Sequence, residues 1–267
     1  MKLYELLASV PDACRDDARY LISDYLSCSI TDLSVMQHTI FTETDMTILK
    51  GWLEKLTQGE PPQYISGRAW FMGHEFVVSP AVLIPRMDTE VLVESLSRHL
   101  KGQETILEIG TGSGIIAISL GKLHPDLILH ATDISPAALE IARQNAKRLD
   151  TKVLFFETDL YPDTSDRYDV IISNPPYIST QEFSELEPRV KDHEPRQALW
   201  GGDDGLEYYR RILEGLDRYL NPGGLIALEH GYDQQQALTE LAGNWGLNIY
   251  ERGKDLAGND RYLILKK

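Results

Sequence analysis

Residues 107–114, with the sequence LEIGTGSG, decide the fold of this chain. They join an apolar run expected to form a buried strand, 105–109, to a run expected to form a helix, 115–123. Glycines at such a turn let a ligand approach the backbone, where the N–H groups of the helix end face it. The third glycine of a dinucleotide fingerprint would fall at Ile115, and the chain has no Gly-Lys-Ser or Gly-Lys-Thr step of a phosphate-binding loop. The loop therefore suits a ligand without a pyrophosphate.

Strands and helices are expected to alternate after this loop. Further strands are predicted at 127–132, 153–157, 168–173 and 225–229, and further helices at 136–149 and 206–220. Two last apolar runs, 247–251 and 261–265, are separated only by a glycine-containing loop. Because a parallel crossover needs a dozen or more residues, usually helical, the last strand should run antiparallel to its neighbour. The prediction is an α/β fold with a doubly wound, mainly parallel seven-stranded sheet whose last strand is antiparallel.

The N-terminal part of the chain has a different pattern. Residues 1–60 read as helices with one apolar face each, which form a small bundle, and residues 69–78 read as a short hairpin. Cys14 and Cys28 fit the apolar stripe of one helix, so we expect them in its core and not in a disulfide framework. The expected organisation is a helical domain over 1–70, a β-hairpin linker over 71–88 and the sheet domain over 89–267.

Three acidic residues lie next to the predicted strand ends. Asp133 follows the second strand, about 20 residues after Gly110, where an acid can accept both hydroxyls of a ribose. Asp159 follows the third strand and either accepts a hydrogen bond from an adenine amino group or is an ordinary exposed acid. Glu108 either binds an ammonium group of the ligand or braces the loop. The arrangement indicates a nucleoside ligand.

Together, the strand-ExGxGxG-helix segment, the acid after the second strand and the antiparallel last strand resemble the class I S-adenosylmethionine-dependent methyltransferase fold. The resemblance covers residues 105–267. It implies S-adenosylmethionine as the cofactor and S-adenosylhomocysteine as the product. We expect no metal and no covalent intermediate, since the chain has no His-Glu-x-x-His, Cys-x-x-Cys or Gly-x-Ser-x-Gly motif.

The segment Asn174-Pro175-Pro176-Tyr177 follows the fourth predicted strand. Two prolines fix φ and remove two N–H donors, so the turn is rigid and presents carbonyl oxygens. The side-chain oxygen of Asn174 and the main-chain oxygen of Pro175 could accept the two N–H bonds of a planar –NH₂ group, with Tyr177 over its flat face. This predicts methyl transfer to such a nitrogen by positioning, without a strong general base. Methyltransferases acting on adenine in DNA, on guanine in RNA and on protein glutamine share this motif.

Further segments distinguish among these substrates. Residues 83–90, LIPRMDTE, resemble the IPRPDTE segment of the HemK/PrmC family of protein glutamine N5-methyltransferases, with Met87 in place of the usual proline. Residues 63–67 and 71–73 resemble its Q-Y-I-x-G and F-x-G elements. Residues 193–199 and 201–206 resemble its EPxxAL and GGxDGL segments. The resemblance therefore spans essentially the whole chain.

The family resemblance implies methylation of the glutamine in the Gly-Gly-Gln motif of class I peptide-chain release factors. It implies a substrate-binding turn at Asn174, Pro175, Pro176 and Tyr177, of which Asn174, Pro175 and Tyr177 are the expected catalytic residues. The implied cofactor contacts are Glu108, Gly110, Thr111, Gly112, Ser113, Gly114, Asp133, Asp159, Leu160 and Asn174, with Leu160 near the adenine. Arg86 either helps to close the site or pairs with an acid.

The charge of the chain bears on the choice of partner. Its 26 basic and 41 acidic residues give a net charge of −15, and neither half has the basic excess of a duplex-binding enzyme. We therefore expect a protein partner, docked by the helical domain, and no direct nucleic-acid binding. No signal peptide or long apolar run is present, so we expect a cytoplasmic protein without membrane contact. The alternatives are a glutamine methyltransferase for a ribosomal protein, a DNA or RNA amino-group methyltransferase, and a nonenzymatic nucleoside-binding module.

Overall fold

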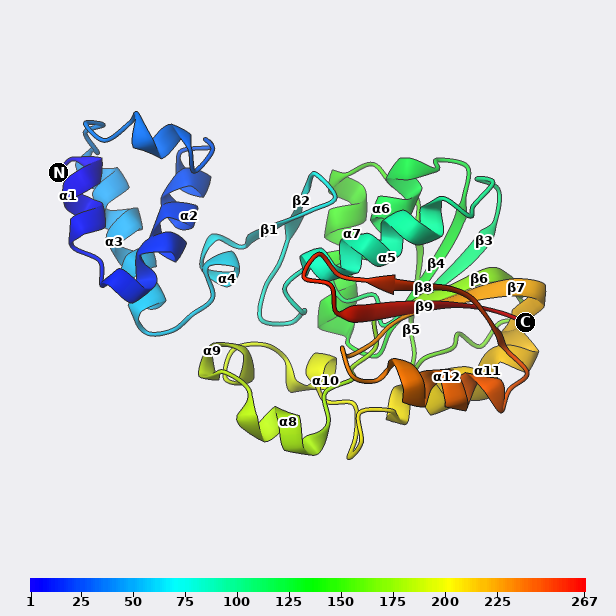
Figure 1. Ribbon diagram of the computed structural model, residues 1–267. Coiled ribbons are helices and arrows are strands. Elements are labelled where there is room, and N and C mark those ends of the chain that lie inside the picture. The colour runs from blue at the N-terminus through cyan, green and yellow to red at the C-terminus, as the bar shows by residue number, and fades with distance from the viewer. The chain divides into compact units, whose positions relative to one another are not determined.

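The computed structural model of the protein describes residues 1–267, and their contacts divide them into two compact units (Figure 1). The smaller unit comprises Met1–Arg68 and Glu187–His193. The larger unit comprises Ala69–Leu186 and Glu194–Lys267. Nothing in the sequence pattern indicated that the short segment at 187–193 would pack with the helical residues rather than with the sheet. None of the helices has both the length and the apolarity needed to cross a lipid bilayer.

The smaller unit is helical. It contains α1 (Leu3–Ala8), η1 (Asp12–Cys14), α2 (Arg15–Tyr25), η2 (Asp32–Ser34), α3 (Glu43–Thr57), α4 (Pro62–Ser66) and α9 (Pro188–Lys191). The apolar faces of α1, α2 and α3 meet in one core. α3 begins with a capping box, in which the Asp45 N–H donates to the Thr42 hydroxyl at 3.2 Å and the Thr42 N–H donates to the Asp45 carboxylate at 2.8 Å. An ion pair of 2.7 Å between Asp17 and Arg189 links α2 to α9.

The two cysteines lie at the ends of α2 and not within it. Cys14 ends η1, and α2 stops at Tyr25 because Ser27 adopts a left-handed φ of 52°, which places Cys28 beyond the helix. The prediction of one helix from Cys14 to Cys28 was therefore wrong at both ends. Both thiols are free and half-buried against the helical core, so their expected packing role remains.

The larger unit is built on a seven-stranded sheet in the order β5-β4-β3-β6-β7-β9-β8. Its strands are β3 (Thr105–Ile109), β4 (Ile128–Asp133), β5 (Leu154–Glu157), β6 (Tyr168–Ser173), β7 (Leu220–Glu229), β8 (Asn248–Lys254) and β9 (Asp260–Lys266). β9 runs antiparallel to both of its neighbours, whereas the pairs from β5 to β7 are parallel. The predicted fold class, including the antiparallel last strand, is confirmed.

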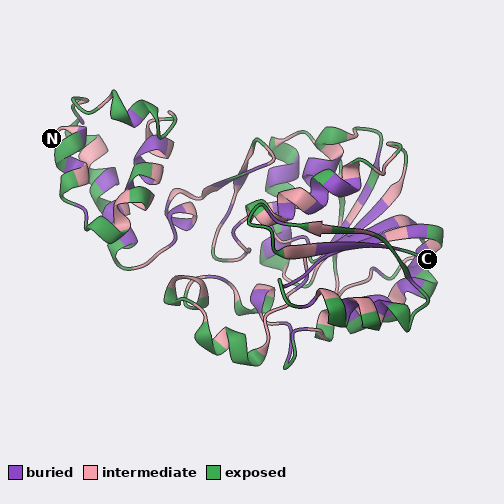
Figure 2. Ribbon diagram, in the orientation of Figure 1, coloured by how far each residue is buried: buried purple, intermediate pink, exposed green.

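Helices cover both faces of this sheet, and the burial is deepest between the layers (Figures 1 and 2). The helices of the unit are α5 (Met87–Ser97), α6 (Ile115–Leu123), α7 (Pro136–Arg148), α8 (Thr180–Glu185), α10 (Arg196–Leu199), α11 (Glu207–Tyr219) and α12 (Gln235–Gly243). Alternate residues of one strand enter opposite cores: Ile106 packs with α5 and α6, whereas Leu107 packs with α11 and α12. This two-sided burial explains why the strands read as continuous apolar runs.

Candidate active site

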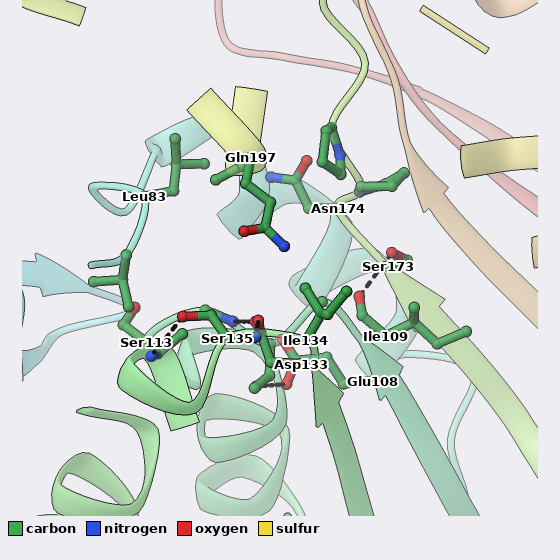
Figure 3. Close-up of a pocket in the computed structure, with 18 of the residues that line it drawn as sticks. Leu83, Glu108, Ile109, Ser113, Asp133, Ile134, Ser135, Ser173, Asn174 and Gln197 are labelled. Carbon is green, nitrogen blue, oxygen red and sulfur yellow. Dashed lines mark hydrogen bonds between the residues drawn. The ribbon is translucent and has the colours of Figure 1, made fainter. Parts of the chain in front are cut away.

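A cavity of about 220 Å³ lies at the carboxyl ends of β3, β4 and β6, within the larger unit (Figure 3). In a doubly wound sheet this is the edge at which ligands bind. The cavity brings together most of the residues predicted for the site. Of these it is lined by Glu108, Gly110, Thr111, Gly112, Ser113, Asp133, Asp159, Leu160, Asn174, Pro175 and Pro176. Gly114 and Tyr177 are not part of its lining.

The three glycines of the loop all have positive φ, but they have different surroundings. A side chain added at Gly110 or Gly112 would meet no atom within 4 Å, so both leave open space. A Cβ at Gly114 would lie 2.8 Å from Ile118 Cδ1 and 3.3 Å from Ala142 Cβ. Gly110 and Gly112 thus leave the backbone accessible to a ligand, whereas Gly114 allows the loop to pack against α6 and α7. The position of Gly114 supports this packing role and gives no support for the expected cofactor contact.

Glu108 is almost fully buried at the end of β3. Its Oε2 accepts hydrogen bonds from the Thr111 hydroxyl at 2.7 Å and from the Ala117 N–H at 3.0 Å, which braces the loop. Its Oε1 is buried and has no hydrogen-bond partner. Burial raises the pKa of Glu108 to about 8, despite the two hydrogen bonds that lower it. One carboxylate thus braces the loop with one oxygen and leaves the other unpaired beside the cavity.

Asp133 ends β4 and faces the glycine loop. Its Oδ2 accepts a hydrogen bond from the Gly112 N–H at 2.8 Å, and its Oδ1 accepts one from the Ser135 N–H at 2.9 Å. Burial raises its pKa, although both backbone hydrogen bonds oppose the shift. Because each carboxylate oxygen can accept a second hydrogen bond, Asp133 orders the loop and still has acceptor capacity for ligand hydroxyls.

Asp159 and Leu160 follow β5 and occupy another part of the lining. Asp159 is half-exposed and forms an ion pair of 2.7 Å with Arg211, so it has the partner of an ordinary surface acid. Leu160 has a left-handed φ of 69°, unusual for a branched side chain, and its carbonyl accepts a hydrogen bond of 2.6 Å from the Thr132 hydroxyl. That contact fixes the backbone of Leu160 at the end of the second and third strands.

The Asn-Pro-Pro-Tyr turn lies beside the glycine loop, as expected. The Ser173 hydroxyl donates to the Ile109 carbonyl at 2.8 Å and thereby ties the end of β6 to the end of β3. The Asn174 side chain donates through Nδ2 to the Thr89 hydroxyl on α5 at 3.1 Å. The Tyr177 ring packs instead against the core under α11 and α12, and its carbonyl accepts a hydrogen bond of 2.9 Å from Gln234. Tyr177 is not part of the cavity lining, and its expected place over the flat face of a substrate amide stays a prediction.

Arg86 pairs with an acid. Its guanidinium lies 2.5 Å from Glu194 Oε1, and the other oxygen of Glu194 accepts a hydrogen bond of 3.3 Å from the Ile84 N–H. Segments on the two sides of this pair line the cavity, namely residues 81–86 on one side and Pro195, Gln197 and Ala198 on the other. The pair therefore holds two walls of the site together, and it combines the two roles left open for Arg86.

Several contributors to the site have no local sequence signal. Asn145 on α7 donates to the Ser113 carbonyl at 2.9 Å and also pairs with the backbone of Val77, in the hairpin of β1 (Arg68–Phe71) and β2 (His74–Val77). In Figure 3 the Gln197 side chain points from α10 into the cavity. Asn145 lies in no recognised motif, and Gln197 occupies a variable position of the segment that resembles EPxxAL, so only the folded structure reveals either role.

The strand order, the glycine loop after β3, the acid after β4 and the antiparallel β9 define a class I S-adenosylmethionine-dependent methyltransferase. The methyltransferase small domain family matches residues 85–188, and the PrmC N-terminal domain family matches residues 5–67. A solved structure of a methyltransferase from Pyrococcus furiosus has the same fold, with a TM-score of 0.57 at 24% identity over 73% of this chain and 89% of that one.

Curated relatives narrow the class to one family. A release factor glutamine methyltransferase from Geobacter sulfurreducens is 38% identical over 92% of this chain and 87% of its own length. The enzymes of the same name from Moorella thermoacetica and Streptococcus pneumoniae are 46% and 42% identical, over 79% and 80% of this chain and 77% of each relative. The chain belongs to the release factor glutamine methyltransferase family.

Proposed function

We propose that the protein transfers a methyl group from S-adenosylmethionine to the side-chain amide nitrogen, N5, of the glutamine in the Gly-Gly-Gln motif of class I peptide-chain release factors. The observation that supports this most is the position of Asn174 and Pro175 in one cavity with the glycine loop. The loop suits a nucleoside cofactor, and the turn suits an amide nitrogen. Membership in the family supports the same reaction.

The cavity has groups that fit S-adenosylmethionine. The unpaired Glu108 Oε1 is an acceptor for the ammonium group of the cofactor, and the open space at Gly110 and Gly112 admits its methionine part. Asp133 has acceptor capacity for the ribose hydroxyls, and Leu160 with Asp159 would contact the adenine end. When bound, the cofactor supplies a sulfonium methyl group that an amide nitrogen takes by in-line displacement, while the sulfur keeps the electron pair and a nitrogen proton leaves to water.

The Asn-Pro-Pro-Tyr turn would hold the glutamine amide for this transfer. Asn174 Oδ1 and the Pro175 carbonyl accept its two N–H bonds, and Pro176 keeps the turn rigid. Both acceptors stabilise the partial positive charge that develops on the nitrogen. Holding the nitrogen in line contributes on the order of 7–11 kcal/mol to lowering the barrier. Tyr177 supports the turn through its half-buried ring, which packs against the core, and through its hydrogen-bonded carbonyl.

The helical unit would dock the release factor. None of the residues that line the cavity belongs to this unit. Two of its apolar side chains are strongly exposed, Val35 at 84% and Ile40 at 72%. We expect Val35→Glu and Ile40→Glu to raise the KM for release factor at least tenfold with an unchanged Kd for S-adenosylmethionine. Leu256→Glu, at a 78% exposed apolar residue of the larger unit, is the matched control. An unchanged KM in both test variants would refute docking at these residues.

Since release factors act in the cytoplasm, we place the protein there.

The function is tested by methyl transfer from labelled S-adenosylmethionine to purified release factor and to a release factor with Gly-Gly-Asn in place of Gly-Gly-Gln. We expect label on the first protein only. Label on the altered release factor, or on a purified ribosomal protein or an adenine-containing oligonucleotide instead, would assign a different acceptor and refute the proposal.

A further inference from the structure

An asparagine that must accept hydrogen bonds from a substrate needs its amide turned in one direction only. With Oδ1 toward the cavity, Asn174 can accept a hydrogen bond from a substrate N–H. If the amide rotates by half a turn, Nδ2 faces the substrate N–H instead, and two donors then meet without an acceptor. In the structure Nδ2 points to the Thr89 hydroxyl, 3.1 Å away. A hydroxyl cannot enforce this direction by itself, because it can donate to Oδ1 as easily as it accepts from Nδ2.

A carboxylate behind the hydroxyl removes this ambiguity. Glu229 ends β7 and is 1% exposed, and Thr89 is fully buried beside it. Hydrogen-bonding interaction with the side chains of Thr89 and Asn174 lowers the pKa of Glu229, and its buried Oε2 has no hydrogen-bond partner. An ionised carboxylate only accepts hydrogen bonds. When the Thr89 proton points to Glu229, the lone pairs of that hydroxyl remain for Asn174 Nδ2.

We propose that Glu229, acting through Thr89, is a positioning residue that keeps Oδ1 of Asn174 directed toward the substrate amide. This rests on the proposed function, in which Asn174 is an acceptor. The direction of the whole chain of hydrogen bonds is set by the charge of Glu229. When Glu229 gains a proton it becomes a donor, the Thr89 hydroxyl is free to reverse, and Asn174 can rotate into the unproductive orientation.

The surroundings of Glu229 hold opposing charges. Burial raises the pKa of Glu229 to about 7, while the charge of Arg261 on β9 lowers that pKa and the charge of Asp88 on α5 raises it. The hydroxyls of Tyr177 after β6 and Tyr209 on α11 also face this region, with Tyr209 donating to the main-chain carbonyl of Glu229 at 2.8 Å. The neighbouring His230 is buried, and burial lowers its pKa, so it is neutral near pH 7. Glu229 is thus the group of this cluster whose charge changes near neutral pH.

The first test compares enzyme variants in the full chain. We expect Glu229→Gln to lower kcat about 10- to 100-fold at pH 8. A glutamine amide can donate to the Thr89 hydroxyl as well as accept from it, so it no longer fixes the direction of the hydrogen bonds. The Kd for S-adenosylmethionine, measured by calorimetry, should stay within twofold. Wild-type kcat at saturating substrates should fall below pH 7, and this acid limb should be missing from Glu229→Gln. Glu251→Gln, which removes a hydrogen-bonded carboxylate from β8 away from the cavity, should keep both kcat and the acid limb.

A second pair of variants, at Thr89, tests the proposal even if Glu229→Gln does not fold. Thr89→Ser keeps the hydroxyl and should retain wild-type kcat within threefold, whereas Thr89→Val keeps the shape without the hydroxyl and should lose at least tenfold. If Thr89 only fills space, Thr89→Val, which keeps the side-chain volume, should retain more kcat than Thr89→Ser. Equal kcat for wild type and Thr89→Val, or an unchanged acid limb in Glu229→Gln, would overturn the proposal.

A third measurement separates this inference from the proposed substrate. In ¹⁵N-asparagine-labelled protein, the side-chain NH₂ signal of Asn174, assigned by its loss in Asn174→Ala, should shift with pH around a midpoint near 7. The shift should be absent in Glu229→Gln. If release factor is not methylated but this titration is found, only the substrate assignment fails. If release factor is methylated and Asn174 does not titrate, only the positioning role fails.

Discussion

Binding of S-adenosylmethionine should release a proton from Glu108 at pH 7. The Glu108 carboxyl is buried with one oxygen unpaired, and its pKa of about 8 leaves about ten protonated molecules for each ionised one at pH 7. Pairing with the cofactor's ammonium group favours the ionised form, because an opposite charge within a few ångströms lowers the pKa of a carboxyl. Binding at pH 7 should thus release about 0.9 of a proton.

Calorimetry measures this proton directly. Titrations of cofactor into protein in buffers of different ionisation enthalpy give the number of protons released from the slope of the observed enthalpy. The expected slope corresponds to about 0.9 proton at pH 7, and the part due to Glu108 should shrink to about 0.1 at pH 9, where this carboxyl is already ionised. The signal depends on binding alone and does not require a release factor.

A matched variant identifies the group. Glu108→Gln keeps the hydrogen-bond acceptor for the Thr111 hydroxyl but cannot ionise, so the proton release at pH 7 should disappear and the Kd should rise about 10- to 100-fold. Zero proton release by the wild type at pH 7, or undiminished release by Glu108→Gln, would show that the unpaired Glu108 oxygen does not bind the ammonium group.

Asn174→Ala should lower kcat about 100- to 1000-fold with a Kd for S-adenosylmethionine within threefold, by single-turnover kinetics and calorimetry; parallel losses in both would show a role in folding or cofactor binding instead. Arg86→Met leaves the buried Glu194 carboxylate without its ion-pair partner and should lower the free energy of unfolding, measured by denaturant titration, by about 1–2 kcal/mol. Adding Glu194→Gln should restore most of this loss. A double variant as unstable as Arg86→Met alone would contradict this expectation. Because the folded-state pKa of Glu229 is raised from 4.5 to about 7, wild-type stability should fall as pH rises through that range, so Glu229→Gln should gain in Tm relative to wild type between pH 5 and pH 8; a relative loss would contradict the sign.

Much of the larger unit could be predicted because its signals are local. The apolar run and glycines at 105–114 predicted a strand, a loop and a helix, and each was found. Strand β7 was predicted too short, since the turn-like sequence at 221–224 bulges out of an extended strand that already pairs at Leu220 with Tyr168. Turn residues show where a chain can bend, but they do not show that pairing resumes on the far side of the bend.

The parts of the site that escaped prediction depend on contacts between distant segments. Thr89, Asn145 and Glu194 each act across a long separation in sequence, on Asn174, Ser113 and Arg86 respectively. No spacing rule connects such pairs, because their proximity arises from the strand order. The packing of the Tyr177 ring is also set from a distance: the motif determines the turn, whereas the core under α11 and α12 contacts the ring.

In the proposed function, the turn at Asn174 and Pro175 directs a methyl group to a glutamine amide nitrogen. The most direct measurement is tandem mass spectrometry of purified release factor after incubation with the protein and S-adenosylmethionine. We expect one added methyl group, on the side-chain nitrogen of the glutamine in Gly-Gly-Gln and on no other residue. A methyl group on a different residue type, or an unmodified glutamine in a reaction that consumes the cofactor, would contradict it.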